Sequence, residues 1–243
     1  MLKKYIKTAK NLLFPLTCFS CEKKIHQGQL CNDCYKKIKF LKPPLCRYCL
    51  RKIDEPEKLT CNKCKTKLYP YMRAISATEY KEPLTKLIQL FKYRNCDYLG
   101  DLLAQLIIKH LEDIQFSAYR YHCITAVPLH RYKLKMRGYN QAEVLANFLS
   151  NHFNIPLRND IISVTRFRPS QTKLARLKRQ NNVKGIFNAS NAVKNLNLIL
   201  VDDIFTTGST IFACSEALKE KGANIITALT LSKTVRNQFK QQS

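Results

Sequence analysis

The stretch LILVDDIFTTGST, residues 198–210, decides the fold that we expect for this chain. It opens with an apolar run, Leu198 to Val201, which is typical of a strand buried on both faces of a parallel sheet. The acids Asp202 and Asp203 follow, and a hydroxyl-rich turn around Gly208 leads into a helical pattern. Because ligands of such sheets bind at the carboxyl ends of the strands, this stretch predicts a ligand site.

The turn and the two acids suit the two ends of a sugar phosphate. Backbone N–H groups and hydroxyls at a helix N-terminus bind phosphate, because the helix carries a partial positive charge there. Adjacent carboxylates repel one another unless hydroxyls or a metal ion engage them, and a ribose diol supplies such hydroxyls. The residues therefore predict a ribose-phosphate pocket. An ordinary turn whose acids cap the following helix is the alternative.

The sequence on either side of this stretch alternates between strand and helix patterns. Predicted strands span residues 74–80, 122–127, 161–167, 196–201 and 225–231, and predicted helices begin near Pro83 and span 98–114, 141–153 and 210–221. Strands that alternate with helices indicate a parallel sheet with helices on both faces. The expected fold class is therefore α/β.

A basic loop is predicted after the strand at 122–127. Arg137 and Gly138 stand where a second anion would meet them, and the arginine fork suits a phosphate group. Between Phe167 and Phe187 a polar, basic segment predicts a flap that shields a reacting sugar. The candidate contacts to nucleic acid in these two segments are Arg131, Lys133, Lys135, Lys173, Arg176, Lys178 and Arg179. For the first segment, a solvated basic loop is the alternative.

Eight of the eleven cysteines form four CxxC pairs, namely Cys18/Cys21, Cys31/Cys34, Cys46/Cys49 and Cys61/Cys64. Two CxxC turns supply the four thiolates of a tetrahedral zinc site, so we expect two structural zinc ions in two sequential ribbons. A cross-braced arrangement, first pair with third, is the alternative ligand set. Disulfides and redox chemistry are further alternatives, and the expected reducing cytosol argues against them.

The chain carries 42 Lys+Arg against 17 Asp+Glu, and its formal net charge of +25 predicts an anionic partner. A hydrophobic content of 45% is that of a folded protein and argues against disorder. No run approaches the ~20 apolar residues that a bilayer span requires. The basic start, residues 1–18, has an apolar core too short for a secretory signal, so we expect an amphipathic helix there and a cytoplasmic location.

The stretch at 198–210 resembles the signature of type I phosphoribosyltransferases, which bind phosphoribosyl pyrophosphate (PRPP) with magnesium. With the doubled cysteine ribbon, Lys92, and the run from Arg137 to Gln141, the chain resembles the ComF family of competence proteins. The resemblance implies that Asp202 and Asp203 hold the ribose hydroxyls, and that Arg137 and Gly138, with Asn140 and Gln141, bind pyrophosphate. The residues that would wrap the 5-phosphate are Thr206, Thr207, Gly208, Ser209 and Thr210.

The resemblance also implies a domain organisation and partners. An N-terminal helix and double zinc ribbon would occupy residues 1–67, a type I phosphoribosyltransferase-like domain residues 72–234, and a C-terminal tail residues 235–243. The implied partners are single-stranded DNA, a competence helicase and recombination mediator proteins. The implied cofactors are two structural zinc ions, and magnesium with PRPP.

Three functions remain open on the sequence. The first is a protein that handles imported single-stranded DNA during natural transformation and binds PRPP. The second is an active phosphoribosyltransferase on an unidentified nucleobase or nucleic-acid acceptor, for which the sequence identifies no base for the nucleophile. The third is a non-catalytic adaptor whose ribbons dock a protein partner, because zinc ribbons contact proteins as well as nucleic acid.

Overall fold

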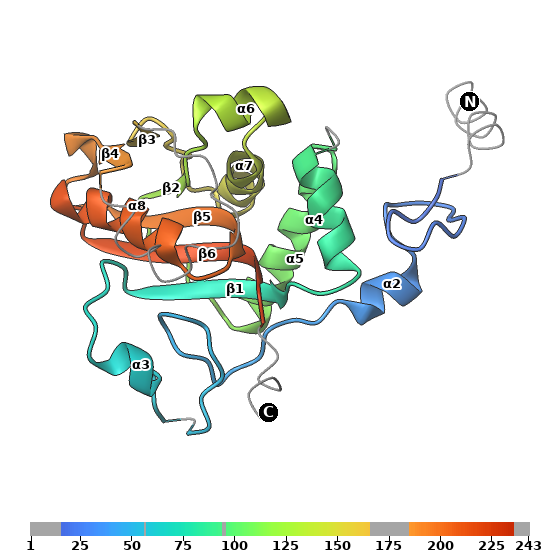
Figure 1. Cartoon of the computed structure of the whole chain (residues 1–243), viewed down its shortest axis with the longest axis horizontal. Helices are drawn as coiled ribbons and strands as arrows, with labels where there is room; N and C mark the ends of the chain where they lie inside the picture. Colours follow the sequence, from blue (N-terminus) through green and yellow to red (C-terminus); the bar gives the residue numbers. More distant parts are fainter. Residues whose placement is uncertain (1–15, 56, 94–95, 166–184, 236–243) are drawn as a thin grey trace, which may run out of the picture.

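The computed structural model describes residues 16–55, 57–93, 96–165 and 185–235 (Figure 1). The helix expected at the N-terminus and most of the flap between Phe167 and Phe187 lie outside these ranges. Four of the candidate nucleic-acid residues lie outside them as well, namely Lys173, Arg176, Lys178 and Arg179. Within the described ranges, no helix combines the length and the apolar character needed to cross a bilayer.

The centre of the molecule is a four-stranded parallel sheet with the order β1-β6-β5-β2. Its strands are β1 (Arg73–Glu79), β2 (Cys123–Ala126), β5 (Asn197–Phe205) and β6 (Ile225–Lys233). A separate antiparallel pair, β3 (Ile162–Val164) and β4 (Phe187–Ala189), flanks it. The parallel sheet expected from the sequence is therefore confirmed for four of the five predicted strands. The strand predicted at 161–167 corresponds to β3, which pairs antiparallel with β4 outside that sheet.

Helices cover both faces of the sheet (Figure 1). Helices α4 (Leu84–Tyr93), α5 (Leu99–Asp113) and α7 (Gln141–Phe153) lie on one face, and α8 (Ser209–Glu220) lies on the other. Asn140 caps α7 as predicted, because its side chain accepts a hydrogen bond from the Ala142 N–H.

Strand β5 shows why its apolar run is continuous. Ile199 and Val201 pack into the core that contains α5 and α7, whereas Leu198 and Leu200 pack into the core that contains α8. All four side chains are fully buried, because successive residues of a strand point to opposite faces and both faces are covered.

The chain between the two ribbons lies along the edge of β1. It forms an antiparallel bridge between Phe40 and Thr78, and the Leu41 N–H donates to the carbonyl of Ala77 over 2.9 Å. The first ribbon, with α2 (Asn32–Lys37), lies near α4, and the second, with α3 (Asn62–Lys65), lies below β1 (Figure 1). Both ribbons are thus joined to the sheet by backbone contacts of their connecting segment.

Two further predictions of local structure were wrong. The segment expected to be a basic loop is a helix, α6 (Arg131–Arg137), with His130 as N-cap and Gly138 as a left-handed C-cap at φ 80°. Gly138 suits this cap because glycine adopts positive φ without steric cost. The strand expected to end at Val201 continues to Phe205, so Asp202 and Asp203 belong to β5 and not to the turn. Pairing with β6 extends the strand, and that partner is not evident from local sequence.

Candidate functional site

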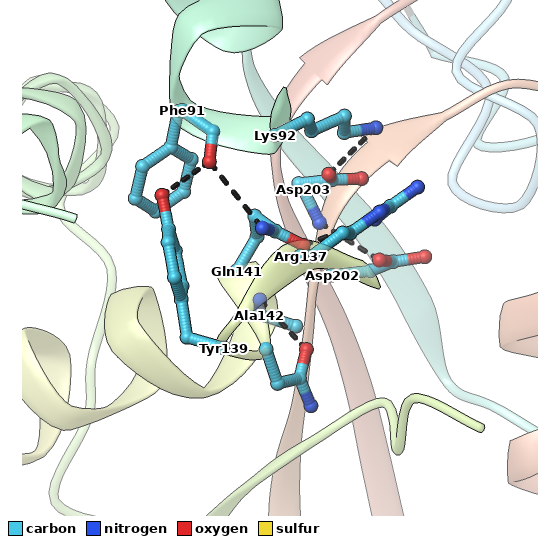
Figure 2. Close-up of polar contacts among 9 residues, drawn as sticks. Phe91, Lys92, Arg137, Tyr139, Gln141, Ala142, Asp202 and Asp203 are labelled. Carbon is cyan, nitrogen blue, oxygen red and sulfur yellow. Dashed lines mark hydrogen bonds and ion pairs between the residues drawn. The ribbon is translucent and has the colours of Figure 1, made fainter. Parts of the chain in front are cut away.

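The carboxylates of the acidic pair lie at the carboxyl end of β5, as Figure 2 shows. Asp203 is buried, and its Oδ2 atom lies 2.7 Å from Nζ of Lys92, in the last turn of α4. The backbone N–H of Asp203 donates to Oδ1 of Asp202 over 2.8 Å. These contacts hold both carboxylates in place and stabilise part of their negative charge.

Lys92 contributes to the family resemblance, but the sequence predicts no role for it in the site. The only local signal is a basic residue directly after Phe91, at the end of a helix whose other face is apolar. The contact of Lys92 with Asp203 joins segments far apart in the chain, so no spacing rule identifies it.

Asp202 has an unusual protonation equilibrium. Burial first, and then the neighbouring charge of Asp203, raise its pKa from 3.8 to about 7. The backbone N–H of Asp203 and the positive charges of Lys92 and Arg137 act in the opposite direction. A cation or a donating hydroxyl from a ligand would lower the pKa of Asp202 back toward its ordinary value, because both favour the carboxylate form.

Arg137 reaches the same edge of the sheet from the end of α6 (Figure 2). Its Nη1 donates to Oε1 of Gln141 over 3.0 Å, and its guanidinium carbon lies 5.3 Å from the ring centre of Tyr93. Gln141 is buried, and its Nε2 donates to the carbonyl of Phe91 over 3.3 Å. The hydroxyl of Tyr139 donates to that same carbonyl. These contacts join the start of α7 to the end of α4 and orient Arg137.

The side chains of Asn140 and Gln141, which the resemblance assigns to pyrophosphate, make hydrogen bonds within the protein. Asn140 caps α7 and donates from Nδ2 to the carbonyl of Val127 over 3.1 Å. Gln141 bonds to Arg137 and to Phe91, as described above. These hydrogen bonds hold the start of α7 against the end of α4 and against the segment after β2, next to Arg137.

The segment from Thr206 to Thr210 leads into α8, which begins at Ser209 and has Gly208 as its N-cap at φ 79°. A Cβ atom on Gly208 would lie 2.5 Å from Cζ of the buried Phe205, so only glycine fits between this ring and the turn. Glycine has no side chain with which to cap the first-turn N–H groups of α8. The hydroxyls of Thr207 and Ser209 lie 2.7 Å apart. The turn therefore offers donors to an anion at a helix N-terminus.

The eight paired cysteines gather in two clusters. Each cluster has four Sγ atoms within 4.8 Å of one another, Cys18, Cys21, Cys31 and Cys34 in the first and Cys46, Cys49, Cys61 and Cys64 in the second. The Sγ atoms of Cys21 and Cys31 are 3.6 Å apart, and so are those of Cys49 and Cys61. A tetrahedral zinc ion with bonds of about 2.3 Å separates its sulfurs by about 3.8 Å. Both clusters fit structural zinc, in the sequential arrangement.

The described candidate residues for nucleic-acid contact lie on α6. Arg131, Lys133 and Lys135 are exposed there, and no residue of this helix is buried. Tyr132 and Met136 are exposed beside them, with relative exposures of 56% and 70%. A short helix thus presents both cations and large apolar side chains to solvent.

Two family models match this chain. The double zinc ribbon domain matches residues 9–72, and the phosphoribosyl transferase domain matches residues 140–242. The first match covers both cysteine clusters, and the second covers the acidic pair and α8.

Curated relatives match over most of the chain. Competence protein F of Haemophilus influenzae is 31% identical over 224 residues, which are 88% of this chain and 95% of the relative. The DNA utilization protein YhgH of Salmonella typhimurium is 27% identical, over 92% of this chain and all of the relative. Competence protein ComFC of Bacillus subtilis is 26% identical, over 84% of this chain and 83% of the relative.

Among solved structures, a hypoxanthine phosphoribosyltransferase from Staphylococcus aureus is similar at a TM-score of 0.37 and 16% identity. That match covers 55% of this chain and 64% of the other, and the conclusion on family does not depend on it. A double zinc ribbon joined to a phosphoribosyltransferase-type sheet, with close to full-length similarity to competence protein F, assigns the chain to the ComF family of competence proteins.

Proposed function

We propose that this protein handles single-stranded DNA during natural transformation and binds PRPP at the carboxyl edge of its sheet. The observation that carries the PRPP proposal is the convergence of three groups at one edge. These are Asp202 and Asp203 on β5, Arg137 at the end of α6, and the turn before α8, whose N-cap Gly208 has no capping side chain. A sugar diol, a pyrophosphate and a 5-phosphate need these three kinds of group.

The electrostatics of the pair support a ligand with hydroxyls or a metal ion. Asp203 is already paired with Lys92, whereas burial and the charge of Asp203 raise the pKa of Asp202, so a cation or a donating hydroxyl would stabilise its carboxylate form. The ribose diol of PRPP would donate to these carboxylates, and magnesium bound with the pyrophosphate would neutralise the charge of that group. Arg137 would bind the pyrophosphate through its bidentate fork.

The DNA proposal rests on charge and on α6. The formal charge of +25 favours any polyanion, and α6 adds exposed Tyr132 beside Arg131 and Lys133. Cations that follow the phosphates and an aromatic ring that stacks on a base are the two components of single-strand binding. The names of the relatives, competence protein F and DNA utilization protein, agree with a role in DNA uptake or use.

Isothermal titration with PRPP and magnesium tests the ligand directly. Saturable binding by the zinc-loaded full chain is expected, and no binding would contradict the PRPP proposal. The same solution is then assayed for released pyrophosphate in the presence of single-stranded DNA or free nucleobases. Release would establish the second candidate, an active phosphoribosyltransferase, which is favoured by the placement of Arg137 near Asp202.

Substitutions on α6 separate the DNA proposal from an adaptor role for the ribbons. Full-length protein and variants of α6 are compared for binding to a fluorescent single strand. One contrary result is that substitution of the charged residues of α6 leaves the affinity for the strand unchanged, with an affinity that is also independent of salt concentration. That result would show that α6 does not bind DNA electrostatically, and docking of a protein partner would then be the better explanation.

A further inference from the structure

A cavity of about 340 Å³ lies beside the turn of residues 206–210, which is the proposed phosphate turn, between the second zinc ribbon and α8. The segment from Lys67 to Tyr71, which leaves the ribbon, forms one side, and Phe212, Ala213 and Glu216 of α8 form the other. Thr207, Gly208 and Ser209 of the phosphate turn line it too. Its volume is at the lower end of the ~300–1,000 Å³ typical of small-molecule sites, which suits one ring system rather than several.

Aromatic rings in fixed positions make up much of the wall. Tyr69 stacks on Tyr48, with ring centres 4.3 Å apart and planes inclined by 6°. It also meets Tyr71 and Phe212 edge-on, at 5.5 and 6.1 Å. The hydroxyl of the buried Tyr71 donates to the carbonyl of Tyr48 over 3.0 Å. Rings that are already ordered lose little freedom when a flat ligand packs on them.

The polar groups of the cavity are few and of different kinds. Lys67 contributes a cation, and Glu216, half-buried on α8, contributes an acceptor. A carboxylate accepts hydrogen bonds from the exocyclic amino groups of bases such as cytosine. The donors of the Thr207–Ser209 turn suit a phosphate at the same end of the cavity. One ligand that joins a flat base to a phosphate satisfies all these groups.

We infer that this cavity takes the base of a nucleoside 5′-phosphate whose phosphate lies on the Thr207–Ser209 turn. The nucleotide is either free or the 5′ end of a DNA strand, since both present the same chemistry. The inference rests on the proposed function in one respect, which is that the turn binds a phosphate. The second zinc ribbon then forms part of a ligand site, and PRPP and the nucleotide compete for the same turn.

The first experiment uses zinc-loaded full-length protein and three probes: deoxycytidine 5′-monophosphate, 2-deoxyribose 5-phosphate and PRPP. The nucleotide should bind about 10-fold more tightly than the sugar phosphate, because base stacking on an aromatic wall contributes on that scale. It should also displace PRPP. Equal affinities for the nucleotide and the sugar phosphate would overturn the inference while leaving PRPP binding intact, and absence of PRPP binding alone would contradict only the proposed function.

Two variants test whether the base of the nucleotide lies in the cavity. Ala213→Leu fills the cavity from α8 and should remove the 10-fold advantage of the nucleotide without loss of sugar phosphate binding. Glu216→Gln keeps the cavity open and should weaken the cytosine nucleotide about threefold but not the thymidine nucleotide, which lacks an exocyclic amino group. Glu220 is exposed one turn further along α8, so Glu220→Gln is the matched control and should change the affinity for neither nucleotide. An unchanged nucleotide advantage in Ala213→Leu would overturn the inference.

The final comparison distinguishes the two sources of the nucleotide. A single-stranded oligonucleotide with a 5′-phosphate is compared with the same strand ending in a 5′-hydroxyl, in the wild type and in Ala213→Leu. If the strand end is the ligand, the 5′-phosphate strengthens binding in the wild type, and Ala213→Leu weakens the phosphorylated strand about 10-fold because the terminal base can no longer stack in the cavity. If the free nucleotide is the ligand, deoxycytidine 5′-monophosphate retains its advantage and the two strands bind alike.

Discussion

Nζ of Lys92 lies 2.7 Å from Oδ2 of Asp203, and both side chains are largely withdrawn from solvent. This ion pair joins the last turn of α4 to the end of β5, at the edge where the proposed PRPP site lies. The pair has two roles in our account, since it stabilises the folded chain and holds one carboxylate in position beside Asp202.

Replacement of Lys92 should therefore be costly for stability. Lys92→Met leaves the buried carboxylate of Asp203 without its cation, and the free energy of unfolding should fall by about 3 kcal/mol. Urea denaturation followed by circular dichroism measures the loss. The double variant Lys92→Met with Asp203→Asn should recover most of it, and a double variant as unstable as the sum of the single variants would contradict a direct interaction.

The pH dependence of stability follows from Asp202. Its pKa is about 7 in the folded chain and near 3.8 when unfolded, so the folded state binds more protons between these values and stability falls as pH rises through them. Asp202→Asn should raise the melting temperature at pH 8 by on the order of 5 °C and have little effect near pH 4. Differential scanning calorimetry without PRPP or magnesium checks this. An equal shift at both pH values would mean that titration of Asp202 is not the cause.

Loss of both acids should separate the ligand site from the zinc ribbons. Asp202→Asn with Asp203→Asn should abolish PRPP binding in isothermal titration, because neither amide supplies the negative charge that the diol and magnesium require. Zinc content, measured by atomic emission, should remain unchanged, since the cysteine clusters lie elsewhere in the fold. Zinc loss in this variant would show that the ribbons and the sheet edge are not independent.

Each cysteine cluster should hold one zinc ion. Cys31→Ser removes one of the four ligands of the first cluster and should reduce zinc content from two ions to one per chain. The first ribbon should then become sensitive to limited proteolysis, because its folding energy comes from the ion. Cys123→Ser, at a buried cysteine of β2 outside both clusters, is the control and should retain both ions.

The cations of α6 should account for part of the salt dependence of DNA binding. Replacement of Arg131, Lys133 and Lys135 by glutamine should reduce the slope of log K against log salt by about 2 for a single strand, because each lost phosphate contact removes about 0.7. Fluorescence anisotropy with a labelled oligonucleotide between low and moderate salt measures the slope. A matched variant with Lys109, Lys219 and Lys221 replaced, all exposed on other helices or at their ends, should keep the original slope.

Local sequence predicted the elements better than their ends. The helices at α4, α5, α7 and α8 and the four strands of the sheet follow from apolar spacing, which reports directly which face of an element is covered. The basic segment at 131–137 was predicted as a loop because α6 buries none of its residues and so shows no apolar stripe. The end of β5 was placed too early because Asp202 and Asp203 are unfavourable in strands, and the pairing of this segment with β6 overrides that preference.

By itself, the sequence determined the four CxxC pairs, the α/β alternation and the glycine turn that leads into α8, because each depends on residues a few positions apart. Only the tertiary structure decided that Lys92 and Arg137 meet the acidic pair, and that the second ribbon and α8 enclose a cavity beside the turn. The physical reason is that these contacts join distant segments, and their distances are set by how helices and ribbons pack on the sheet rather than by spacing along the chain.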